Sequence, residues 1–414
     1  MSECDKKLSI LQINVLGATL STGRTTREMH NYFLENNIDS YIACPTNKDC
    51  NDAFVFNSLN FMRLNTLLAM ITGLEAYHSS LQTRKLLKYI SKIKPDIVHL
   101  RVLHNNCINI GMLLKYLAKH DIATVITLHD FWFMTGKCCL YAGLNCYKWQ
   151  TGCGNCPALP LDKRRMLFDR TSYMWQNKNK WFSAIPRLAV VGVSDWTVEE
   201  AKKSYLKDAK ILRRIYNWID LSVFYPRNVG NMREELGLEN KFIILAVSAN
   251  WNLGGGKGLD YYLELSKKMP DNYHIILIGK MNYEGDLPSN ITSIPRTDNT
   301  DELAMYYSLA DVYLNLSLHE TFGKVSAEAV SCGTPVVAFD STANKEIVPP
   351  GGGMLIDALS CDKILLALNE IEKKPKSEYI DICRKFAEEN FEKVANIKEY
   401  INLYNELIKG EKQS

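Results

Sequence analysis

The sequence predicts an α/β protein with two doubly wound parallel sheets. Short apolar runs rich in β-branched residues alternate with helical patterns through most of the 414 residues, and the alternation occurs in two successive series. The stretch "NWIDLSVFYPRN" at 217–228 separates the two series and is typical of a linker. We therefore expect an N-terminal domain over 1–220, a C-terminal domain over 221–395, and a last helix over 396–414 that packs back on the N-terminal domain.

Each expected element follows from a local pattern. The N-terminal runs expected as strands are "LSILQINVLG", "DSYIACP", "PDIVHLR", "ATVITLHD" and "LAVVGVS", with helical patterns at 25–37, 81–92 and 110–120. The C-terminal runs are "KFIILAVSA", "YHIILIG", "ITSIP", "DVYLNLS" and "TPVVAFD". Doubly wound sheets bind ligands at the carboxyl ends of their strands. We therefore expect the active site in the cleft between the two domains.

The composition excludes several classes of protein. Apolar residues make up 46% of the chain and charged residues 23%, as in an ordinary globular protein. The net charge of +3 is too small to suggest a nucleic-acid partner. The apolar runs are shorter than the ~18 residues of a membrane span. The N-terminal run has no small-residue cleavage site, so we expect a buried first strand and a cytoplasmic protein with reduced cysteines.

Residues 61–78, "FMRLNTLLAMITGLEAYH", are apolar, carry few charges and follow no clear strand. The simpler interpretation is a helix buried in the fold. The alternative is a surface helix that contacts a membrane or a lipid-linked substrate. On that alternative the protein is peripheral, on the inner face of the cell membrane.

The most informative stretch is "LSLHETFGKVSAEAVSCGTPVVAFD", which begins at Leu316. A strand is expected to end near Leu316 and a helix to begin at Phe322 or Gly323, with Glu320 in the turn between them. Gly323 would let a ligand approach the backbone, and the free N–H groups of the first helical turn attract phosphate or sugar oxygens. Glu328 follows Glu320 by eight residues, so the two carboxylates could each hold hydroxyls of one ligand. The simpler alternative is an acidic residue that caps the helix plus an ordinary helix glutamate.

This stretch resembles the glutamate-x7-glutamate signature of the retaining glycosyltransferases of family 4, which have the two-domain fold called GT-B. The resemblance extends through "NTDELAMYYSLADVYLNLSLHETFGKVSAEAVSCGTPVVA", which is similar to the donor-binding region of that family. The element containing Lys257 and Gly258, the "STGR" loop and "TLHDFWFMTGKC" also match. Within the family, the chain is most similar to bacterial transferases that build exopolysaccharides such as colanic acid.

The resemblance implies a role for each matching residue. Glu328 is expected to bind the ribose hydroxyls of a nucleotide sugar, and Glu320 to hold a hydroxyl of the donor sugar. Lys257 is expected to neutralise the donor diphosphate, where a fixed cation stabilises the departing nucleoside diphosphate. On residue type alone, Lys257 in "NLGGGKGLD" could equally be solvated, although the glycines favour phosphate. The other residues expected to bind the donor are Phe322 and Gly323 through their backbone amides, Lys324, Gly258, Gly23, Arg24, Arg296 and Thr297.

One position departs from the family pattern. Many members have an arginine where this chain has Trp251, so a second cation for the diphosphate must come from elsewhere. Arg296, in "IPRTDNTDEL", and Arg24, at the start of the first helix, are the candidates. Arg24 follows Gly23 in the short glycine loop that approaches the diphosphate in the family, although the glycines could simply serve a turn. The loop at 296–299 is expected to select the nucleobase.

Polar residues at strand ends of the N-terminal domain are candidates for the reaction centre and the acceptor side. The resemblance implies that His129 contacts the donor sugar or the reaction centre, although a histidine there is more often structural. Asp130, His99 and His104 are expected to line the acceptor side. Ser194 ends another strand and is the weakest candidate.

Five of the 12 cysteines lie in "TGKCCLYAGLNCYKWQTGCGNCP", with the spacing C-C-x6-C-x6-C-x2-C. The terminal C-x2-C with further thiols upstream suits a tetrahedral structural zinc site formed by Cys138, Cys146, Cys153 and Cys156. The alternative is buried or partly oxidised cysteines without a metal. A nucleophilic cysteine is not expected, because no neighbouring histidine pattern would activate it. The stretch is expected to form an insertion at about 135–160, beside His129 on the acceptor side.

The sequence therefore predicts a retaining glycosyltransferase that transfers a sugar from a nucleoside-diphosphate sugar to a hydroxyl of a glycan, and the resemblance implies that this glycan is a lipid-linked oligosaccharide. The resemblance implies front-face chemistry in which His129, Glu320 and Lys257 act, with no protein nucleophile and no catalytic metal or other cofactor. Two alternatives stay open. The first is a nucleotide-sugar epimerase of the same fold, and the second is a non-catalytic nucleotide-sugar-binding protein.

Overall fold

The computed structural model describes residues 7–46, 50–162, 166–357 and 360–410, and its chain divides into two compact units. The first unit comprises Met1–Ile215 together with Ile397–Ser414, and the second is Tyr216–Asn396. The first boundary therefore lies a few residues before the expected one at Asp220. The chain re-enters the first unit within its last helix.

The first unit contains a parallel sheet whose seven described strands have the order β3-β2-β1-β4-β5-β6-β7. Its central strands are almost entirely buried, and all six residues of β5 are inaccessible. Burial on both faces explains why these segments are continuous apolar runs rather than alternating ones. The strands are β1 (Ser9–Ile13), β2 (Asp39–Cys44), β3 (Phe54–Val55), β4 (Ile97–Leu100), β5 (Ala123–Leu128), β6 (Leu188–Gly192) and β7 (Ile211–Arg214).

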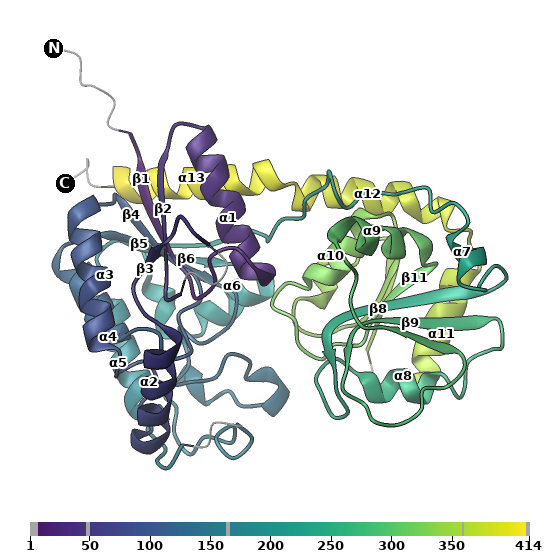
Figure 1. Cartoon of the computed structure of the whole chain (residues 1–414), viewed down its shortest axis with the longest axis horizontal. Helices are drawn as coiled ribbons and strands as arrows, with labels where there is room; N and C mark the ends of the chain where they lie inside the picture. Colours follow the sequence, from purple (N-terminus) through teal and green to yellow (C-terminus); the bar gives the residue numbers. More distant parts are fainter. Residues whose placement is uncertain (1–6, 47–49, 163–165, 358–359, 411–414) are drawn as a thin grey trace. The chain divides into compact units, whose positions relative to one another are not determined.

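Helices cover both faces of this sheet. In Figure 1, α3, α4 and α5 lie side by side on one face, while α1 and α13 lie on the other. The helices of this unit are α1 (Leu20–Glu35), α2 (Leu59–Thr72), α3 (Ser80–Ile93), α4 (Ile110–Lys119), α5 (Thr171–Ser183), α6 (Asp195–Lys202) and α13 (Lys393–Lys409), with short 3₁₀ turns at Ala142–Leu144, Lys148–Gln150 and Tyr205–Asp208.

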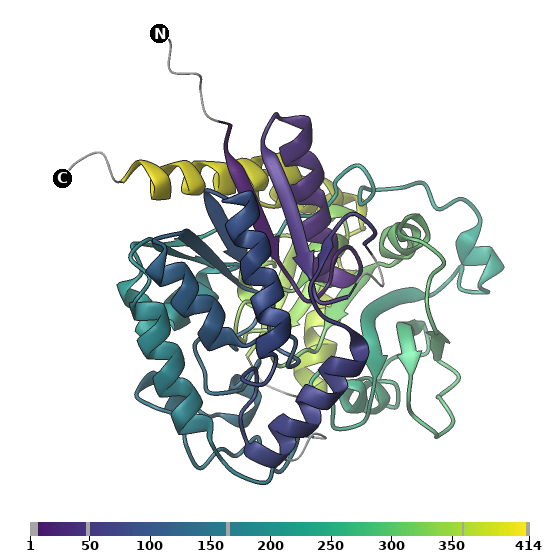
Figure 2. The same cartoon turned by 60° about the vertical axis from the view of Figure 1, so that its left-hand side comes forward.

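Two buried tyrosines attach α13 to the first sheet. The hydroxyl of Tyr404 lies 2.8 Å from Nδ1 of His99 on β4, and the hydroxyl of Tyr400 lies 3.1 Å from Oγ1 of Thr127 on β5. The ring of Tyr404 also contacts Phe33 of α1 edge to face. Figure 1 and Figure 2 both show α13, in yellow, passing beside α1. Strand β4 therefore keeps a polar histidine in its interior because the last helix supplies a hydrogen-bond partner.

The second unit has a parallel sheet of six described strands in the order β10-β9-β8-β11-β12-β13. Helices α9, α10 and α12 cover one face, and α8 and α11 cover the other (Figure 1). The elements are β8 (Phe242–Trp251), β9 (Tyr273–Met281), β10 (Ile291–Ile294), β11 (Val312–Asn315), β12 (Val336–Phe339), β13 (Gly353–Ile356), α7 (Met232–Glu235), α8 (Leu259–Leu265), α9 (Thr300–Leu309), α10 (Lys324–Ser331), the 3₁₀ turn Asn344–Glu346, α11 (Cys361–Glu372) and α12 (Ser377–Phe391).

Helix α2 turns its apolar side chains outward. Its buried residues are Asn65 and Ala69, and the Asn65 amide donates to Oγ of Ser79 at 2.6 Å. A buried hydrogen bond on the inner face therefore helps to hold the helix to the unit. Five large apolar side chains are about half exposed instead: Leu59, Phe61, Leu64, Leu67 and Ile71. The interpretation of 61–78 as a helix buried in the fold is wrong, since the helix ends at Thr72 and lies at the surface. The buried Glu75 and Ala76 follow it in a non-helical stretch. None of the described helices has the length and apolar character needed to cross a membrane.

Removing the Tyr404 hydroxyl should destabilise the first unit. The Tyr404→Phe variant leaves Nδ1 of His99 buried without its partner, which costs about 1–3 kcal/mol. Urea denaturation followed by circular dichroism should show this loss, while Tyr173→Phe, at an exposed tyrosine, should leave the midpoint unchanged. Equal stability of Tyr404→Phe and the parent would mean that this contact does not hold α13.

Candidate active site

The predicted donor motif lies between β11 and α10 in the second unit. Helix α10 begins at Lys324, one residue after the expected start, and Gly323 precedes it with φ +88°. A residue with a side chain is strained in this left-handed region, so glycine suits the position. The half-buried Lys324 lies in the first turn of the helix.

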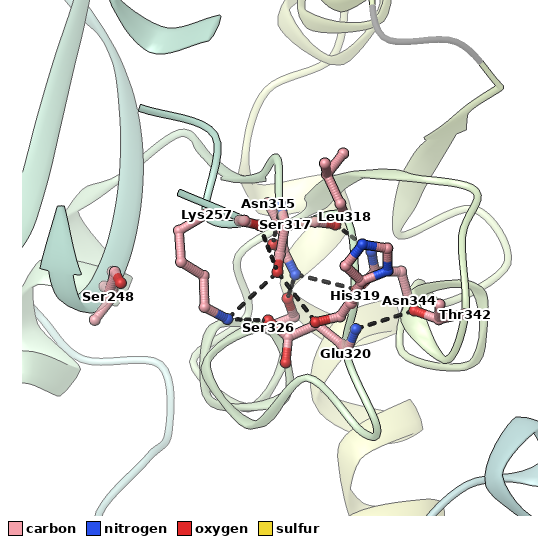
Figure 3. Close-up of polar contacts among 12 residues, drawn as sticks. Ser248, Lys257, Asn315, Ser317, Leu318, His319, Glu320, Ser326, Thr342 and Asn344 are labelled. Atoms are coloured by element: carbon pink, nitrogen blue, oxygen red, sulfur yellow. Dashed lines mark hydrogen bonds and ion pairs between the residues drawn. The ribbon is translucent and has the colours of Figure 1, made fainter. Parts of the chain in front are cut away.

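Lys257 and Glu320, which were both predicted to bind the donor, are in direct contact. Their side chains form an ion pair, and Nζ of Lys257 also lies 3.3 Å from Oγ of Ser317. Figure 3 shows the ammonium group of Lys257 pointing toward Glu320 and Ser317. The Lys257 side chain is 44% exposed and that of Glu320 is 15% exposed, so the cation remains accessible to a ligand. The structure thus brings together residues 63 positions apart in the chain.

The glycine-rich loop lies against the strand end that carries the motif. Gly258 has φ +80°, and a Cβ atom there would lie 2.7 Å from the carbonyl oxygen of Leu316. The N–H group of Leu318 donates to the carbonyl of Gly256 at 3.1 Å. Any side chain at position 258 would push the two loops apart, which explains why a glycine follows Lys257.

A buried polar network supports the motif, and the sequence did not reveal it. The amide of Asn315 donates to Oγ of Ser326 at 2.9 Å, and the amide of Asn344 donates to the carbonyl of Ser317 at 3.0 Å. The backbone N–H group of Glu320 donates to Oγ1 of Thr342 at 3.0 Å (Figure 3). These contacts fix the turn that presents Glu320. The one local signal was the pair of polar residues, Asn315 and Ser317, at the end of an apolar strand.

His319, beside Glu320, also contributes to the motif without having been singled out as a site residue. Its Nδ1 is buried and has no hydrogen-bond partner within the described protein. Burial lowers the pKa of the ring, against the opposing charge of Glu320. A buried polar atom without a partner costs free energy, so this histidine is a candidate contact for a ligand.

Glu328 lies deeper than the other predicted donor residues. Its side chain is 5% exposed, and one carboxylate oxygen accepts a hydrogen bond from the hydroxyl of Tyr307 at 3.1 Å. The Phe322 side chain is also buried, against Tyr216 and Phe391, so only its backbone could face a ligand.

Trp251 does not take the place of the missing arginine. Its ring is 1% exposed, its Nε1–H group donates to the carbonyl of Ile278 at 3.1 Å, and it packs edge to face on Tyr262. The side chain therefore belongs to the core. Arg296 is exposed and Thr297 half-buried after β10.

In the first unit, a buried arginine holds His129. Nη2 of Arg101 lies 3.0 Å from Nε2 of His129 and 2.7 Å from Oγ1 of Thr25 on α1. A guanidinium only donates hydrogen bonds, so Nε2 of His129 must accept, which requires its proton on Nδ1. Gly23 and Arg24 lie in the first turns of the same helix, so the predicted loop and His129 share one edge of the sheet. Arg101 was missed, although an arginine directly after an apolar strand was the available signal.

His104 and Asp130 form a partly exposed ion pair at the same edge of the first sheet as His129. Nε2 of His104 lies 3.3 Å from Oδ2 of Asp130. Burial alone would lower the pKa of His104, but the hydrogen bond and charge of Asp130 outweigh it and raise that pKa. His104 lines a pocket of about 410 Å³ together with the buried Glu75, the ion pair of Lys137 with Asp162, and apolar residues of α2. Glu75 was missed, although it is the one acid in the apolar segment 61–78.

Two of the candidate residues at strand ends, His99 and Ser194, are buried, and this contradicts an acceptor-side position for His99. His99 is fully buried, and its Nδ1 and Nε2 lie 2.8 Å from the hydroxyls of Tyr404 and Thr127. Burial, reinforced by the charge of Arg101, lowers its pKa well below the usual value, so it is a neutral core residue. Ser194 is likewise buried, where its hydroxyl caps α6 by accepting from the N–H group of Thr197 at 3.1 Å.

Residues 22–223 match the family described as "Glycosyltransferase Family 4", and residues 229–392 match "Glycosyl transferases group 1". The chain belongs to the family 4 glycosyltransferases. The expected family, enzyme class and GT-B fold are thereby confirmed.

Relatives connect this glycosyltransferase with polysaccharide synthesis. The colanic acid biosynthesis glycosyl transferase WcaC of Escherichia coli K12 is 23% identical over 325 residues, which cover 76% of this chain and 77% of WcaC. The O-antigen chain mannosyltransferase RfbU of Salmonella typhimurium is 25% identical over 171 residues, covering 39% of this chain and 45% of RfbU. The structure of Anabaena HepE in complex with UDP-glucose matches with a TM-score of 0.64 and 15% identity, covering 96% of this chain and 99% of HepE.

The charge of Asp130 should control the titration of His104. In the Asp130→Asn variant, the pKa of His104 should fall, because the carboxylate that favours the imidazolium is lost while burial remains. Stability from the ion pair is present below the unfolded pKa of histidine and is lost as the pH rises through the raised folded pKa. Titration of the His104 ring by NMR measures the shift.

The matched control for this titration is Asp121→Asn, at a carboxylate that pairs with Arg187 instead. This control should leave the His104 titration unchanged. If Asp130→Asn also left it unchanged, the contact with Asp130 would not set the charge of His104.

Proposed function

We propose that this glycosyltransferase moves a sugar, with retention of configuration, from a nucleoside-diphosphate sugar to a hydroxyl of a lipid-linked glycan. The bond between the anomeric carbon and the diphosphate oxygen breaks, and a bond to the acceptor oxygen forms on the same face. The acceptor proton passes to the leaving phosphate. No protein nucleophile and no catalytic metal takes part.

The observation that carries this proposal is the meeting of Lys257, Glu320 and Ser317 beside the first turn of α10. An ammonium has three N–H donors, and two of them serve Glu320 and Ser317. The third is available for a diphosphate oxygen, near backbone N–H groups that also attract anions. A cation in this position stabilises the charge that gathers on the leaving nucleoside diphosphate. The complex of HepE with UDP-glucose supports a donor of this chemical class.

In this proposal, Glu320 and Glu328 bind different parts of the donor. Glu320 binds a hydroxyl of the transferred sugar, because its accessible carboxylate is held beside Lys257. Glu328 binds the ribose from the interior of the site, where Tyr307 orients its carboxylate. His319 is a further candidate for the donor, since its Nδ1 is buried without a partner.

The pocket of about 410 Å³ in the first unit is the proposed acceptor site. Its polar groups, Glu75, His104, Lys137 and Asp162, suit the hydroxyls of a sugar. The wall formed by Ala69 and Met70 of α2 is apolar and suits a lipid. An epimerase acts on one nucleotide sugar and needs no such pocket, so the pocket favours a transferase.

The surface beside this pocket suits a membrane. The outward side chains of α2 are joined by Leu167 and Phe168, which are 72% and 55% exposed. The N–H group of Leu167 donates to the carbonyl of Met70 at 2.8 Å, so the two segments form one apolar surface. Arg63 on α2 is exposed and could meet anionic headgroups. We define this surface, α2 with Leu167 and Phe168, as the apolar face, and propose that it contacts the inner face of the cell membrane.

Replacing Lys257 should weaken both donor binding and turnover. Without the cation, kcat/KM of Lys257→Ala should fall about 10²–10³-fold. Release of nucleoside diphosphate that depends on added lipid-linked glycan measures turnover, after a thermal-shift screen of nucleotide sugars has identified the donor. Lys267→Ala, an exposed lysine after α8, is the control and should match the parent. Full turnover by Lys257→Ala would overturn the assignment, and diphosphate release without acceptor would favour another enzyme class.

Polar substitutions on α2 should abolish membrane binding. The triple variant Phe61→Ser, Leu64→Ser, Leu67→Ser removes side chains that each contribute up to about 1.5–3 kcal/mol on full burial. Its binding to phosphatidylglycerol vesicles in a flotation assay should fall more than tenfold (about 1.4 kcal/mol).

The control for the vesicle experiment is the triple variant Leu34→Ser, Leu366→Ser, Ile382→Ser. These residues are also exposed but lie on other helices, so their loss should not change binding. Failure of the parent protein to float with vesicles, or an equal effect of the two triple variants, would contradict the role of the apolar face.

A further inference from the structure

Four cysteines of the first unit surround one small cavity. The cavity measures about 20 Å³ and is lined by Cys138, Cys146, Cys153 and Cys156. A water-sized atom needs roughly 10–15 Å³, so the cavity has room for one atom. The neighbouring Cys139 lines only the larger pocket, whereas Cys138 lines both.

A tight turn brings Cys153 and Cys156 to the same cavity. Between them, Gly154 has φ +140° and Asn155 has φ +44°. Nζ of Lys148 donates to the carbonyls of Gly154 and Asn155 at 3.2 and 2.9 Å, which holds the turn closed. Two cysteines in a C-x2-C turn are a common half of a tetrahedral metal site.

Backbone donors are aimed at two of the sulfur atoms. The N–H group of Gly136 donates to Sγ of Cys153 at 3.2 Å, and the N–H groups of Ala158 and Leu159 donate to Cys156. Donors in this position stabilise a thiolate, which is the form of cysteine that binds a metal.

Two lysines lie close enough to offset the charge of a metal thiolate centre. Lys148 lines the cavity itself. Lys178 on α5 is buried and donates to the carbonyls of Trp132 and Thr135 at 2.7 and 3.1 Å. It also donates to the carbonyl of Gly136 at 3.4 Å, the residue whose N–H group donates to Cys153. Four thiolates around one divalent cation leave a net charge of −2, which these two ammonium groups balance.

We propose that Cys138, Cys146, Cys153 and Cys156 bind one structural zinc ion. Four sulfur–zinc bonds form, each thiol gives its proton to solvent, and no oxidation or reduction takes place. Zinc suits the site because it accepts four thiolates in tetrahedral geometry. All four coordination positions are then filled by protein, so the ion has a structural role and no open position for substrate.

The nearby group of His104, Asp130 and Cys139 is a weaker candidate for a metal. Its ligand atoms all lie within 4.8 Å of one another. However, the carboxylate of Asp130 already serves His104 and the N–H group of Trp132, and a fourth ligand is lacking among the described residues of this group. In the described part of the chain, the sulfur atoms of Cys138, Cys146, Cys153 and Cys156 are not all within 4.8 Å of one another. Zinc should therefore draw these four sulfur atoms inward around the cavity.

The ion would fix the wall of the larger pocket. Cys138, Leu140 and Leu144 line that pocket, and all three belong to the segment 138–156 that the four cysteines close on itself. If the pocket binds the acceptor, as the proposed function has it, loss of zinc should raise KM for the acceptor and leave donor binding to the second unit unchanged. Zinc content itself does not depend on the proposed function.

Metal analysis by mass spectrometry of protein purified without chelator tests the proposal. We expect about one zinc per chain in the parent and background zinc in Cys153→Ser combined with Cys156→Ser. Cys139→Ser is the matched control and should keep the full zinc content. A thermal shift with the nucleoside diphosphate of the donor identified by the screen reports separately whether the second unit of each variant is intact.

A second measurement covers the case in which the double variant does not fold. A mercurial reagent added to the folded parent should release one zinc, detected with a chromogenic chelator. In a separate sample, Co²⁺ added to reduced parent that has been freed of zinc should give the absorption of a tetrahedral thiolate site. Absence of zinc, with no uptake of Zn²⁺ or Co²⁺ by the reduced parent, would overturn the proposal. Disulfides among the four cysteines in freshly isolated protein, or a full zinc content in the double variant, would overturn it too.

Discussion

Burial of both faces of each parallel sheet is the constraint on which the functional architecture depends. Strands covered on both sides are filled with apolar residues, so groups that do chemistry are confined to the segments directly after the strands. His129 follows β5, Arg101 follows β4, and Ser317 and Glu320 follow β11. The polar residues that do lie inside strands, such as Gln12 and His99, are bonded to other buried groups. The sheet thereby separates residues that hold the fold together from residues that can meet a ligand.

The charged side chains at the carboxyl ends of the strands are arranged differently in the two units. In the second unit, the cation of Lys257 is partly exposed and balanced by Glu320, so a diphosphate can join an existing pair. In the first unit, the cation of Arg101 is buried, and its partners are neutral oxygens, a sulfur and a ring nitrogen. Burial lowers the pKa of Arg101, although the guanidinium stays charged at neutral pH. Such a fixed cation orients His129 and keeps its Nε2 unprotonated, which a solvated arginine could not do.

The motif around Glu320 could be predicted because it is local: a strand end, a turn and a helix start lie within a dozen residues. Its supporting residues could not, since Thr342 and Asn344 lie on a later segment that only the folded chain brings near. The buried position of His99 could not be predicted for the same reason, because its hydrogen-bond partner Tyr404 is 305 residues away in the chain. The orientation of α2 was ambiguous, since an apolar helix is usually buried and its periodicity does not say which face is inward. The arginine of the family pattern is replaced by Trp251, and the structure places this side chain in the core.

The return of the last helix makes the order of synthesis important for this chain. The sheet of the first unit is complete in sequence at β7, yet Tyr400 and Tyr404 come from a helix made after the whole of Tyr216–Asn396. On the ribosome, the second unit can therefore finish folding while β4 still exposes His99 to water. The first unit becomes native only when α13 emerges, so nascent chains pass through a state in which one unit is folded and the other awaits its last element.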